Sequence, residues 1–322
     1  VIDLFKEMAK TGCVEFLGET YFHSLSFLYS REEFRDQIDM HSAKIESLFG
    51  QRPTVFRNTE LTYNNDVAHF INEMRNPDGS RRWKGILCEG VDRILGFRSP
   101  NYVYRPPNTE EGAIKGKPFG VLCKNYRLSD DIAFRFSNRA WAEWPLSTEK
   151  FAKWVHQING DGYLCNLFMD YETFGEHQWA DTGIFQFMED LPAKVFDVAR
   201  GENHFITPSE AFEQFSPVGE YDVPHMISWA DTERDLSAWL GNAMQSNALA
   251  ETYKVEREIK QALRDAEKSK DPAAIERTGH LLNDWRKLTT SDHFYYMCTK
   301  WFSDGDVHKY FNPYDSPYDS YI

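Results

Sequence analysis

The spacing of apolar positions divides this chain of 322 residues into two parts with different periodicity. Up to about residue 225, short apolar runs alternate with segments of helical spacing, which is typical of a β/α architecture. Seven runs have the length and composition of strands, namely residues 14–17, 54–57, 85–88, 95–98, 119–124, 163–169 and 204–207. The pattern therefore predicts an α/β fold for the first part of the chain.

Beyond Asp231 the apolar spacing is that of helices alone. Three apolar stripes follow one another, carried by Leu249, Tyr253, Ile259 and Leu263, then by Leu281, Leu282, Trp285 and Leu288, and last by Phe294, Met297, Cys298 and Trp301. Ser30, Thr207 and Asp271 each stand where a helix N-cap is expected. We therefore expect two domains, one over residues 1–228 and a helical one over residues 229–322.

One apolar run ends in residues that are suited to chemistry on a sugar. Residues 163–169 read as a buried strand, and Asp170, His177 and Trp179 follow closely. In parallel α/β barrels the catalytic residues lie at the carboxyl ends of the strands. A carboxylate there, beside aromatic rings that can cover a sugar, is what glycosyl transfer requires. The alternative is a surface loop whose acids are only solvated.

A second carboxylate, Glu60, follows the run at 54–57 and so also lies just past a strand end. Two such carboxylates fit glycoside hydrolysis, in which one attacks the anomeric carbon while the other donates a proton and later accepts one. In a retaining enzyme the two carboxyl groups lie about 5–5.5 Å apart, and we expect Glu60 and Asp170 to face each other in this way. We also expect burial and the charge of Glu60 to raise the pKa of Asp170 above about 3.9.

Four segments resemble motifs of glycoside hydrolase family 57, the α-amylase and 4-α-glucanotransferase family, and they occur in the family's order. They are GCVEFLGETYFH (residues 12–23), FRNTEL (56–61), MDYETFG (169–175) and SWADTERDLSAWLGN (228–242). The resemblance covers nearly the whole chain. It implies an incomplete (β/α)7-type barrel that is followed by an α-helical bundle domain.

The resemblance also implies roles for individual residues. Glu60 matches the family's nucleophile and Asp170 its acid/base, and we expect neither a metal nor an organic cofactor. The candidate substrate-binding residues are His23, His177, Trp179, Trp229 and Asp231. Two alternatives stay open. His23 is equally well explained as a structural imidazole, whereas sugar contact is favoured for Trp229 over the alternative of a tryptophan wedged between barrel and bundle.

The chain departs from the family at several points. The family's first motif, a histidine-bearing strand, is absent, and Phe56 and Leu61 stand where many members have tryptophan and arginine. The Asp-Gly-Glu-Lys-Phe-Gly of many members is here Asp170-Tyr171-Glu172-Thr173-Phe174-Gly175. These variations resemble the compact amylase-like branch. Because the chain starts without Met inside a helical pattern and ends without a cap, we interpret it as a fragment that lacks the first barrel strand.

Composition narrows the partners and the compartment. A net charge of −14, from 36 basic and 50 acidic residues, argues against nucleic acid or an anionic membrane as a partner. The five cysteines form no C-x-x-C pair, and four of them lie in apolar runs, which indicates buried thiols in a reducing, cytoplasmic compartment. No run of about 18 apolar residues is present, so we expect no transmembrane helix.

The sequence therefore predicts a retaining glycosidase or transglycosidase that acts on α-1,4-glucans such as starch, glycogen and maltooligosaccharides. Hydrolysis, 4-α-glucan transfer and branching stay open, as does the oligomeric state. One alternative is a metal-dependent carbohydrate deacetylase, whose site requires aspartates and closely spaced histidines, but no H-x(3–5)-H pair exists here. The other is a non-catalytic glycan-binding relative, which would not need both Glu60 and Asp170.

Overall fold

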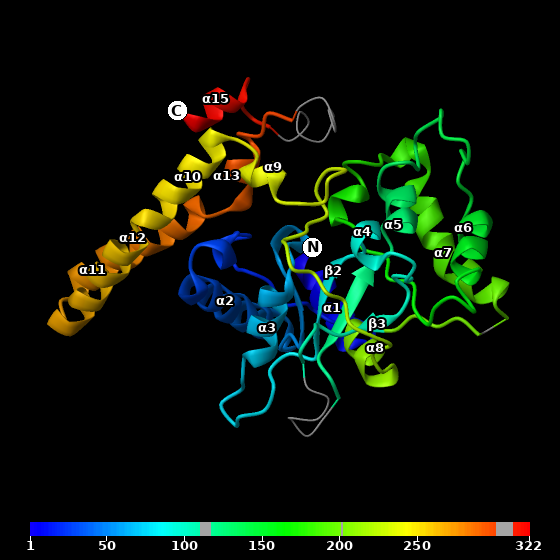
Figure 1. Cartoon of the computed structure of the whole chain (residues 1–322), viewed down its shortest axis with the longest axis horizontal. Helices are drawn as coiled ribbons and strands as arrows, with labels where there is room; N and C mark the ends of the chain where they lie inside the picture. The colour runs from blue at the N-terminus through cyan, green and yellow to red at the C-terminus, as the bar shows by residue number, and fades with distance from the viewer. Residues whose placement is uncertain (110–116, 201, 301–311) are drawn as a thin grey trace. The chain divides into compact units, whose positions relative to one another are not determined.

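The computed structural model describes residues 1–109, 117–200, 202–300 and 312–322 (Figure 1). Its contacts divide the chain into two compact units. The unit that we call the sheet unit comprises Val1–Phe16, Thr54–Phe56 and Asn64–Pro224, and the helical unit comprises Leu17–Pro53, Arg57–Tyr63 and His225–Ile322. These units are interleaved along the chain, whereas the two expected domains meet at residue 228, and that division stays a prediction.

The sheet unit is built on a mixed four-stranded sheet with the order β1-β2-β4-β3. The strands are β1 (Val55–Arg57, whose last residue belongs to the helical unit), β2 (Gly85–Glu89), β3 (Val103–Tyr104) and β4 (Gly120–Lys124). β2 and β4 pair in parallel with Gly85 opposite Gly120, and β3 runs antiparallel to β4 at the edge. The predicted α/β fold is therefore confirmed.

Three of the seven predicted strands are confirmed, because residues 54–57 and 119–124 contain β1 and β4 and residues 85–88 cover all of β2 except its last residue, Glu89. The strand predicted at 95–98 is wrong, since helix α4 (Asp92–Leu95) ends there and Gly96 turns the chain with a φ of 61°. Residues 14–17, 163–169 and 204–207 form no regular strand either. Their apolar side chains favour an extended chain, but a strand also needs a neighbour that supplies a regular ladder of hydrogen bonds.

The same unit contains several helices, and Figure 1 shows α5, α6 and α7 grouped together to one side of the sheet. The helices are α1 (Ile2–Lys10), α3 (Asn65–Glu73), α4, α5 (Tyr126–Ala133), α6 (Thr148–His156), α7 (Ile184–Val198) and α8 (Pro208–Gln214), with the short 3₁₀ turns η3 (Tyr171–Thr173) and η4 (Ala180–Thr182). The expected capping box starts α8, since Thr207 Oγ1 accepts from Glu210 N and the Glu210 carboxylate accepts from Thr207 N. Phe151, Ile184 and Phe187 form part of the core beneath α5 to α7.

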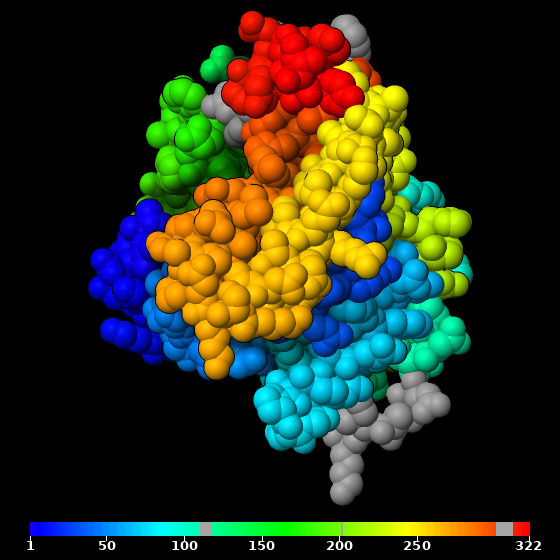
Figure 2. Space-filling view, turned by 90° about the vertical axis from the view of Figure 1, so that its left-hand side faces the viewer, coloured from blue at the N-terminus to red at the C-terminus, as the bar shows by residue number. Residues whose placement is uncertain are grey.

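The helical unit consists of helices and short turns. They are η1 (Ser26–Leu28), α2 (Arg31–Phe49), η2 (Thr59–Leu61), α9 (Ser237–Leu240), α10 (Ala243–Lys254), α11 (Glu256–Ser269), α12 (Pro272–Leu288), α13 (Ser291–Tyr295) and α15 (Pro317–Tyr321). Figure 2 shows α11 and α12, in yellow and orange, lying side by side. Trp239 on α9, Trp285 on α12 and Phe294 on α13 form part of the core of this unit. Trp301, the last residue of the third predicted stripe, lies outside the described residues.

Two of the expected caps in the helical unit are confirmed. Ser30 Oγ accepts from Glu33 N at the start of α2, and the Asp271 carboxylate accepts from Ala273 N at the start of α12. Glu33 does not turn back to close a capping box at Ser30, because its carboxylate binds Arg286 at 2.7 Å instead.

Buried thiols are confirmed at two neighbouring positions of the sheet. Cys88 on β2 and Cys123 on β4 are buried, and their sulfur atoms lie 3.8 Å apart, well beyond a covalent S–S bond. None of the five cysteines forms a disulfide. Within the part of the chain that the structure describes, we find no helix long and apolar enough to cross a membrane.

Two glycines at paired positions of the sheet make room for an aromatic ring. A Cβ atom added to Gly85 would lie 2.3 Å from Phe212 Cζ, and one added to Gly120 would lie 2.2 Å from Phe212 Cδ1. Phe212 belongs to α8 and is buried, so its ring rests directly on the backbone of β2 and β4. The two glycines therefore set the distance between α8 and the sheet.

We expect Gly120→Ala to destabilise the protein by about 1–3 kcal/mol, because the added methyl group overpacks the seat of Phe212. Urea unfolding followed by circular dichroism measures this change. The double variant Gly120→Ala/Phe212→Leu should recover part of the loss. Gly219→Ala is the matched control, since a Cβ there meets no atom within 4 Å and should change stability by less than about 0.5 kcal/mol. Equal effects at both glycines would contradict the proposed close contact between the Phe212 ring and Gly120.

Candidate active site

Glu60 lies in a strained turn directly after β1. Residues Thr59–Leu61 form η2, in which Glu60 has φ 57° and ψ 24° and Leu61 has φ 51°. Left-handed backbone costs a residue with a side chain about 1–2 kcal/mol. Tyr63 and Ile227 hold the turn by exchanging two backbone hydrogen bonds of 2.9 Å. Strain of this kind gathers at functional sites, where it fixes the direction of a side chain.

Both carboxylate oxygens of Glu60 accept a hydrogen bond inside the helical unit. His23 Nε2 lies 2.9 Å from Oε1, and the indole nitrogen of Trp229 donates to Oε2 at 2.7 Å. The Glu60 side chain is 17% exposed, so few water molecules compete with these two donors. The plane of the carboxylate is therefore fixed, while each oxygen keeps a lone pair for a substrate.

His23 connects Glu60 to a second carboxylate. Its Nδ1 lies 2.7 Å from Oε1 of Glu19, which also accepts from Arg57 Nη1 at 3.2 Å. A neutral imidazole carries one N–H and can donate to only one of two carboxylates, whereas the protonated ring donates to both. The geometry thus requires an imidazolium between Glu19 and Glu60.

The charges of these four groups balance and set their pKa values. Burial opposes the charge on His23, but the hydrogen bonds to Glu19 and Glu60 raise its pKa from 6.5 to about 10. Burial also opposes the charge on Glu19, yet Arg57 and His23 lower its pKa to about 2. For Glu60, hydrogen bonds from His23 and Trp229 and the charge of Arg57 outweigh burial and lower the pKa. Glu60 is therefore an ionised, oriented carboxylate at neutral pH.

The structure brings together three of the predicted site residues, namely Glu60, His23 and Trp229. Both ring nitrogens of His23 face carboxylates, and the edge of the Trp229 ring faces Glu60 while Arg57 lies 5.1 Å from the ring centre. The side chain of Asp231, also in the helical unit, is 4% exposed, and its Oδ2 lies 3.5 Å from Lys300 Nζ. Sugar contacts by His23, Trp229 and Asp231 stay predictions.

The other three predicted residues belong to the sheet unit. Asp170 is exposed and directly precedes η3, and Trp179 is 60% exposed directly before η4. Burial lowers the pKa of His177, which stands in the tight loop between them. The expected approach of Asp170 to Glu60 stays a prediction, as do the sugar contacts of His177 and Trp179. Within residues 1–109, 117–200, 202–300 and 312–322, no group of three or more His, Cys, Asp or Glu is placed to hold a metal ion.

Glu19 and Arg57 are the members of this site that the sequence did not reveal. Both lie inside motif segments, but a glutamate in a loop and an arginine at a strand end are common features. The one available signal was the spacing of Glu19 and His23, four residues apart. Such a spacing predicts a contact only in a helix, and here the pair lies in an irregular turn.

Comparison with known proteins defines the class to which this site belongs. Residues 1–224 match the model of glycosyl hydrolase family 57. The chain is also 42% identical over 325 aligned residues to a protein of Methanocaldococcus jannaschii that bears the provisional name alpha-amylase. That alignment covers 100% of this chain and 64% of the relative, so the chain spans less than two thirds of the relative's length. The chain belongs to glycosyl hydrolase family 57, a family of glycosidases.

Two solved structures show the same fold at low sequence identity. The GH57-type branching enzyme of Pyrococcus horikoshii has a TM-score of 0.68 and 16% identity, with 96% of this chain and 63% of that chain covered. The alpha-amylase AmyC of Thermotoga maritima has a TM-score of 0.60 and 15% identity, with 96% and 67% covered. At these identities the likeness concerns the fold alone. It confirms the predicted α/β fold of the (β/α)7-barrel type.

We expect the ring of His23 to stay protonated throughout the neutral range and to titrate near pH 10, because two carboxylates stabilise its charge. Its contribution to stability should accordingly be complete below pH 6.5 and fade as the pH rises toward 10. Nitrogen-15 NMR of the histidine rings measures the titration. Glu19→Gln should lower the titration pH of His23, whereas Glu46→Gln, at a surface pair with Arg52, should not. A wild-type ring that titrates near pH 6.5 would disprove the bridge.

Proposed function

We propose that this chain carries the nucleophile of a retaining enzyme that cleaves or transfers α-1,4-linked glucans. The observation that carries the proposal is the carboxylate of Glu60, held ionised between the imidazolium of His23 and the indole of Trp229. A general acid would need a proton on this group, whereas a nucleophile needs the charge that these contacts preserve. Glu60 is therefore assigned the attack on the sugar.

In the first step an oxygen of Glu60 forms a bond to the anomeric carbon while the bond from that carbon to the glycosidic oxygen breaks. Asp170 gives its proton to the departing oxygen. In the second step Asp170 takes a proton from water or from a sugar hydroxyl, whose oxygen then displaces Glu60. The negative charge of Glu60 disappears while the glycosyl ester exists, so the electrostatic environment of Asp170 changes between its two tasks.

The surroundings of Glu60 support the first step by preorganisation. Its two hydrogen bonds and its strained backbone leave the carboxylate little freedom, so little reorganisation is needed when the sugar arrives. The same donors stabilise the charge and thereby make the carboxylate less reactive. In the glycosyl ester, the N–H groups of His23 and Trp229 still face the two oxygens of Glu60. These contacts offset part of the lost reactivity.

The substrate and the acceptor follow from the relatives and stay part of this proposal. One relative is named an alpha-amylase and one solved neighbour a branching enzyme, so both hydrolysis and transfer of α-glucan chains are represented. We propose an α-glucan as the partner, no metal or organic cofactor, and a cytoplasmic location. Family membership favours a glycosidase over a carbohydrate deacetylase. A non-catalytic glycan-binding relative would not need an ionised Glu60.

We expect Glu60→Gln to abolish turnover of maltooligosaccharides while glucan binding persists, because an amide cannot form the glycosyl ester. Asp170→Asn should reduce turnover of natural glucans most and spare a substrate with a good leaving group in the first step. Steady-state kinetics with both substrates measure these changes. Glu251→Gln, at an exposed pair with Lys254, is the control and should behave as wild type. Near wild-type turnover by Glu60→Gln would overturn the assignment.

We expect the α-anomer to be released first, because two displacements at the anomeric carbon restore its configuration. Proton NMR of the earliest products, before mutarotation, reads the anomer directly. Incubation with a second oligosaccharide then separates hydrolysis from transfer by the lengths of the products. Initial release of the β-anomer would contradict the retaining mechanism, although it would leave glucan cleavage intact.

A further inference from the structure

The peptide segment that carries His23 is held from two sides within the helical unit. On one side, Gln37 of α2 accepts from the backbone N–H of Phe22 at 3.3 Å and from the hydroxyl of Ser24 at 2.8 Å. On the other side, Thr290 Oγ1 donates to the Phe22 carbonyl and Ser291 N donates to the His23 carbonyl, both at 2.9 Å. His23 thus owes its backbone position to α2, to Thr290 before α13 and to Ser291 at the start of α13.

Gln37 can make these contacts in one orientation only. Its amide oxygen faces two donors at Phe22 and Ser24, and its amide nitrogen faces two acceptors, Glu33 Oε1 at 3.0 Å and Thr289 Oγ1 at 3.4 Å. Gln37 and Glu33 are completely buried, so no solvent can replace a lost partner. Glu33 therefore determines which end of the Gln37 amide points toward the segment that carries His23.

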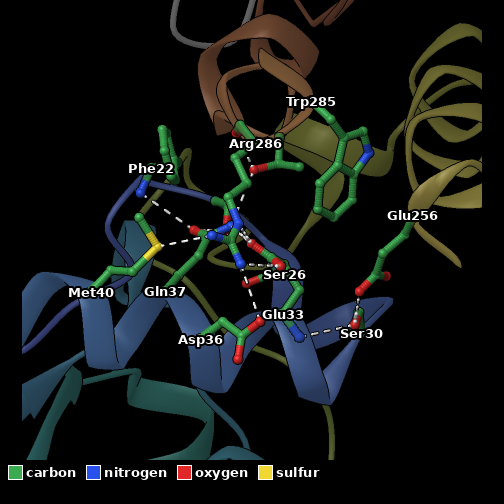
Figure 3. Close-up of polar contacts among 12 residues, drawn as sticks. Phe22, Ser26, Ser30, Glu33, Asp36, Gln37, Met40, Glu256, Trp285 and Arg286 are labelled. Carbon is green, nitrogen blue, oxygen red and sulfur yellow. Dashed lines mark hydrogen bonds and ion pairs between the residues drawn. The ribbon is translucent and has the colours of Figure 1, made fainter. Parts of the chain in front are cut away.

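An ion cluster fixes Glu33 itself, and Figure 3 shows Glu33, Asp36 and Arg286 of this cluster together with Gln37 and Phe22. Arg286 of α12 binds both carboxylate oxygens of Glu33, at 2.7 and 3.1 Å, and Lys260 of α11 lies 3.0 Å from Oε2. Asp36 contacts both cations, at 3.1 and 3.3 Å. Lys260 on α11 and Arg286 on α12 thus hold the Glu33 carboxylate of α2 in one position.

The buried polar contacts also continue to the turn that carries Glu60. Ser24 N donates to Thr20 Oγ1 at 2.9 Å, and Thr20 Oγ1 lies 2.6 Å from Thr59 Oγ1. Thr59 directly precedes Glu60 and is fully buried, and Ser24 is only 1% exposed. A line of buried polar groups therefore runs from the ion cluster past His23 to the turn of the nucleophile.

We propose that Gln37, oriented by the Glu33–Arg286 pair, is a positioning residue for catalysis, which holds the His23 ring against Glu60. The inference rests on the proposed function of Glu60 as the nucleophile. A buried ion pair is poor support for stability alone, because well-packed apolar residues of similar volume often stabilise a fold more. The Glu33–Arg286 pair instead fixes the orientation of the Gln37 amide. The amide in turn fixes the position of the segment that carries His23.

The test is Gln37→Met in the whole chain, which keeps the length of the side chain and removes both ends of the amide. A displacement of the His23 segment by a fraction of an ångström should lower kcat about 10- to 100-fold. KM should stay within about twofold, because Gln37 does not touch the sugar. The matched control is Gln261→Met on α11, an exposed glutamine that pairs with Asp265, and it should retain wild-type kinetics.

Gln37→Glu is the conservative variant that separates positioning from a merely structural role. Its carboxylate still accepts from Phe22 N and Ser24 but repels Glu33, so kcat should lie between those of the wild type and Gln37→Met. If Gln37→Met does not fold, Thr290→Val replaces it, since it loosens the same segment by removing the hydrogen bond that Thr290 Oγ1 donates to the Phe22 carbonyl from the opposite side. Wild-type kcat in the folded variants would overturn the inference.

A second readout separates failure of this inference from failure of the proposed function. The nitrogen-15 signals of the His23 ring, assigned with His23→Gln, report the contact with Glu60 without any substrate. They should shift in Gln37→Met and stay unchanged in Gln261→Met. Unchanged ring signals in Gln37→Met would sink the inference even if wild-type protein cleaves glucans. Shifted signals in a protein that cleaves no glucan would retain the positioning role and refute the function.

Discussion

The imidazolium of His23, shared by Glu19 and Glu60, is the interaction on which the rest of this site depends. Its two ring nitrogens contact Glu19, which lies in a loop, at 2.7 Å and Glu60, which lies in a turn, at 2.9 Å. Without it Glu60 would be a partly buried carboxylate whose charge is opposed by desolvation. With it, the side chain keeps its charge and its direction at the same time.

Charge balance explains why Arg57 belongs to this unit. Two carboxylates and one imidazolium leave a net negative charge in a partly buried site, and the guanidinium of Arg57 restores neutrality at 3.2 Å from Glu19. The same guanidinium lies over the Trp229 ring, whose N–H points at Glu60. Each donor around Glu60 is therefore itself held by a neighbour, and this gives the Glu60 carboxylate a defined geometry.

The sequence revealed those features that depend on neighbouring residues. The caps at Ser30, Thr207 and Asp271 and the strands β1, β2 and β4 could be predicted, as could the place of Glu60 just past a strand end. The Glu33–Arg286 pair could not, because 253 positions separate its members and no local pattern joins them. For the same reason the grouping of residues 17–53 with the C-terminal helices appears only in the structure.

The left-handed backbone at Glu60 and Leu61 has a consequence for how this protein would change under selection. Glycine adopts such a conformation without the penalty that a side chain brings, so a change of Glu60 to glycine would relax the turn. The same change would remove the carboxylate that His23 and Trp229 contact, and it would leave the positive charges of His23 and Arg57 unbalanced. Backbone strain and charge balance therefore pull this position in opposite directions, and a lineage that lost Glu60 would be expected to lose His23 as well.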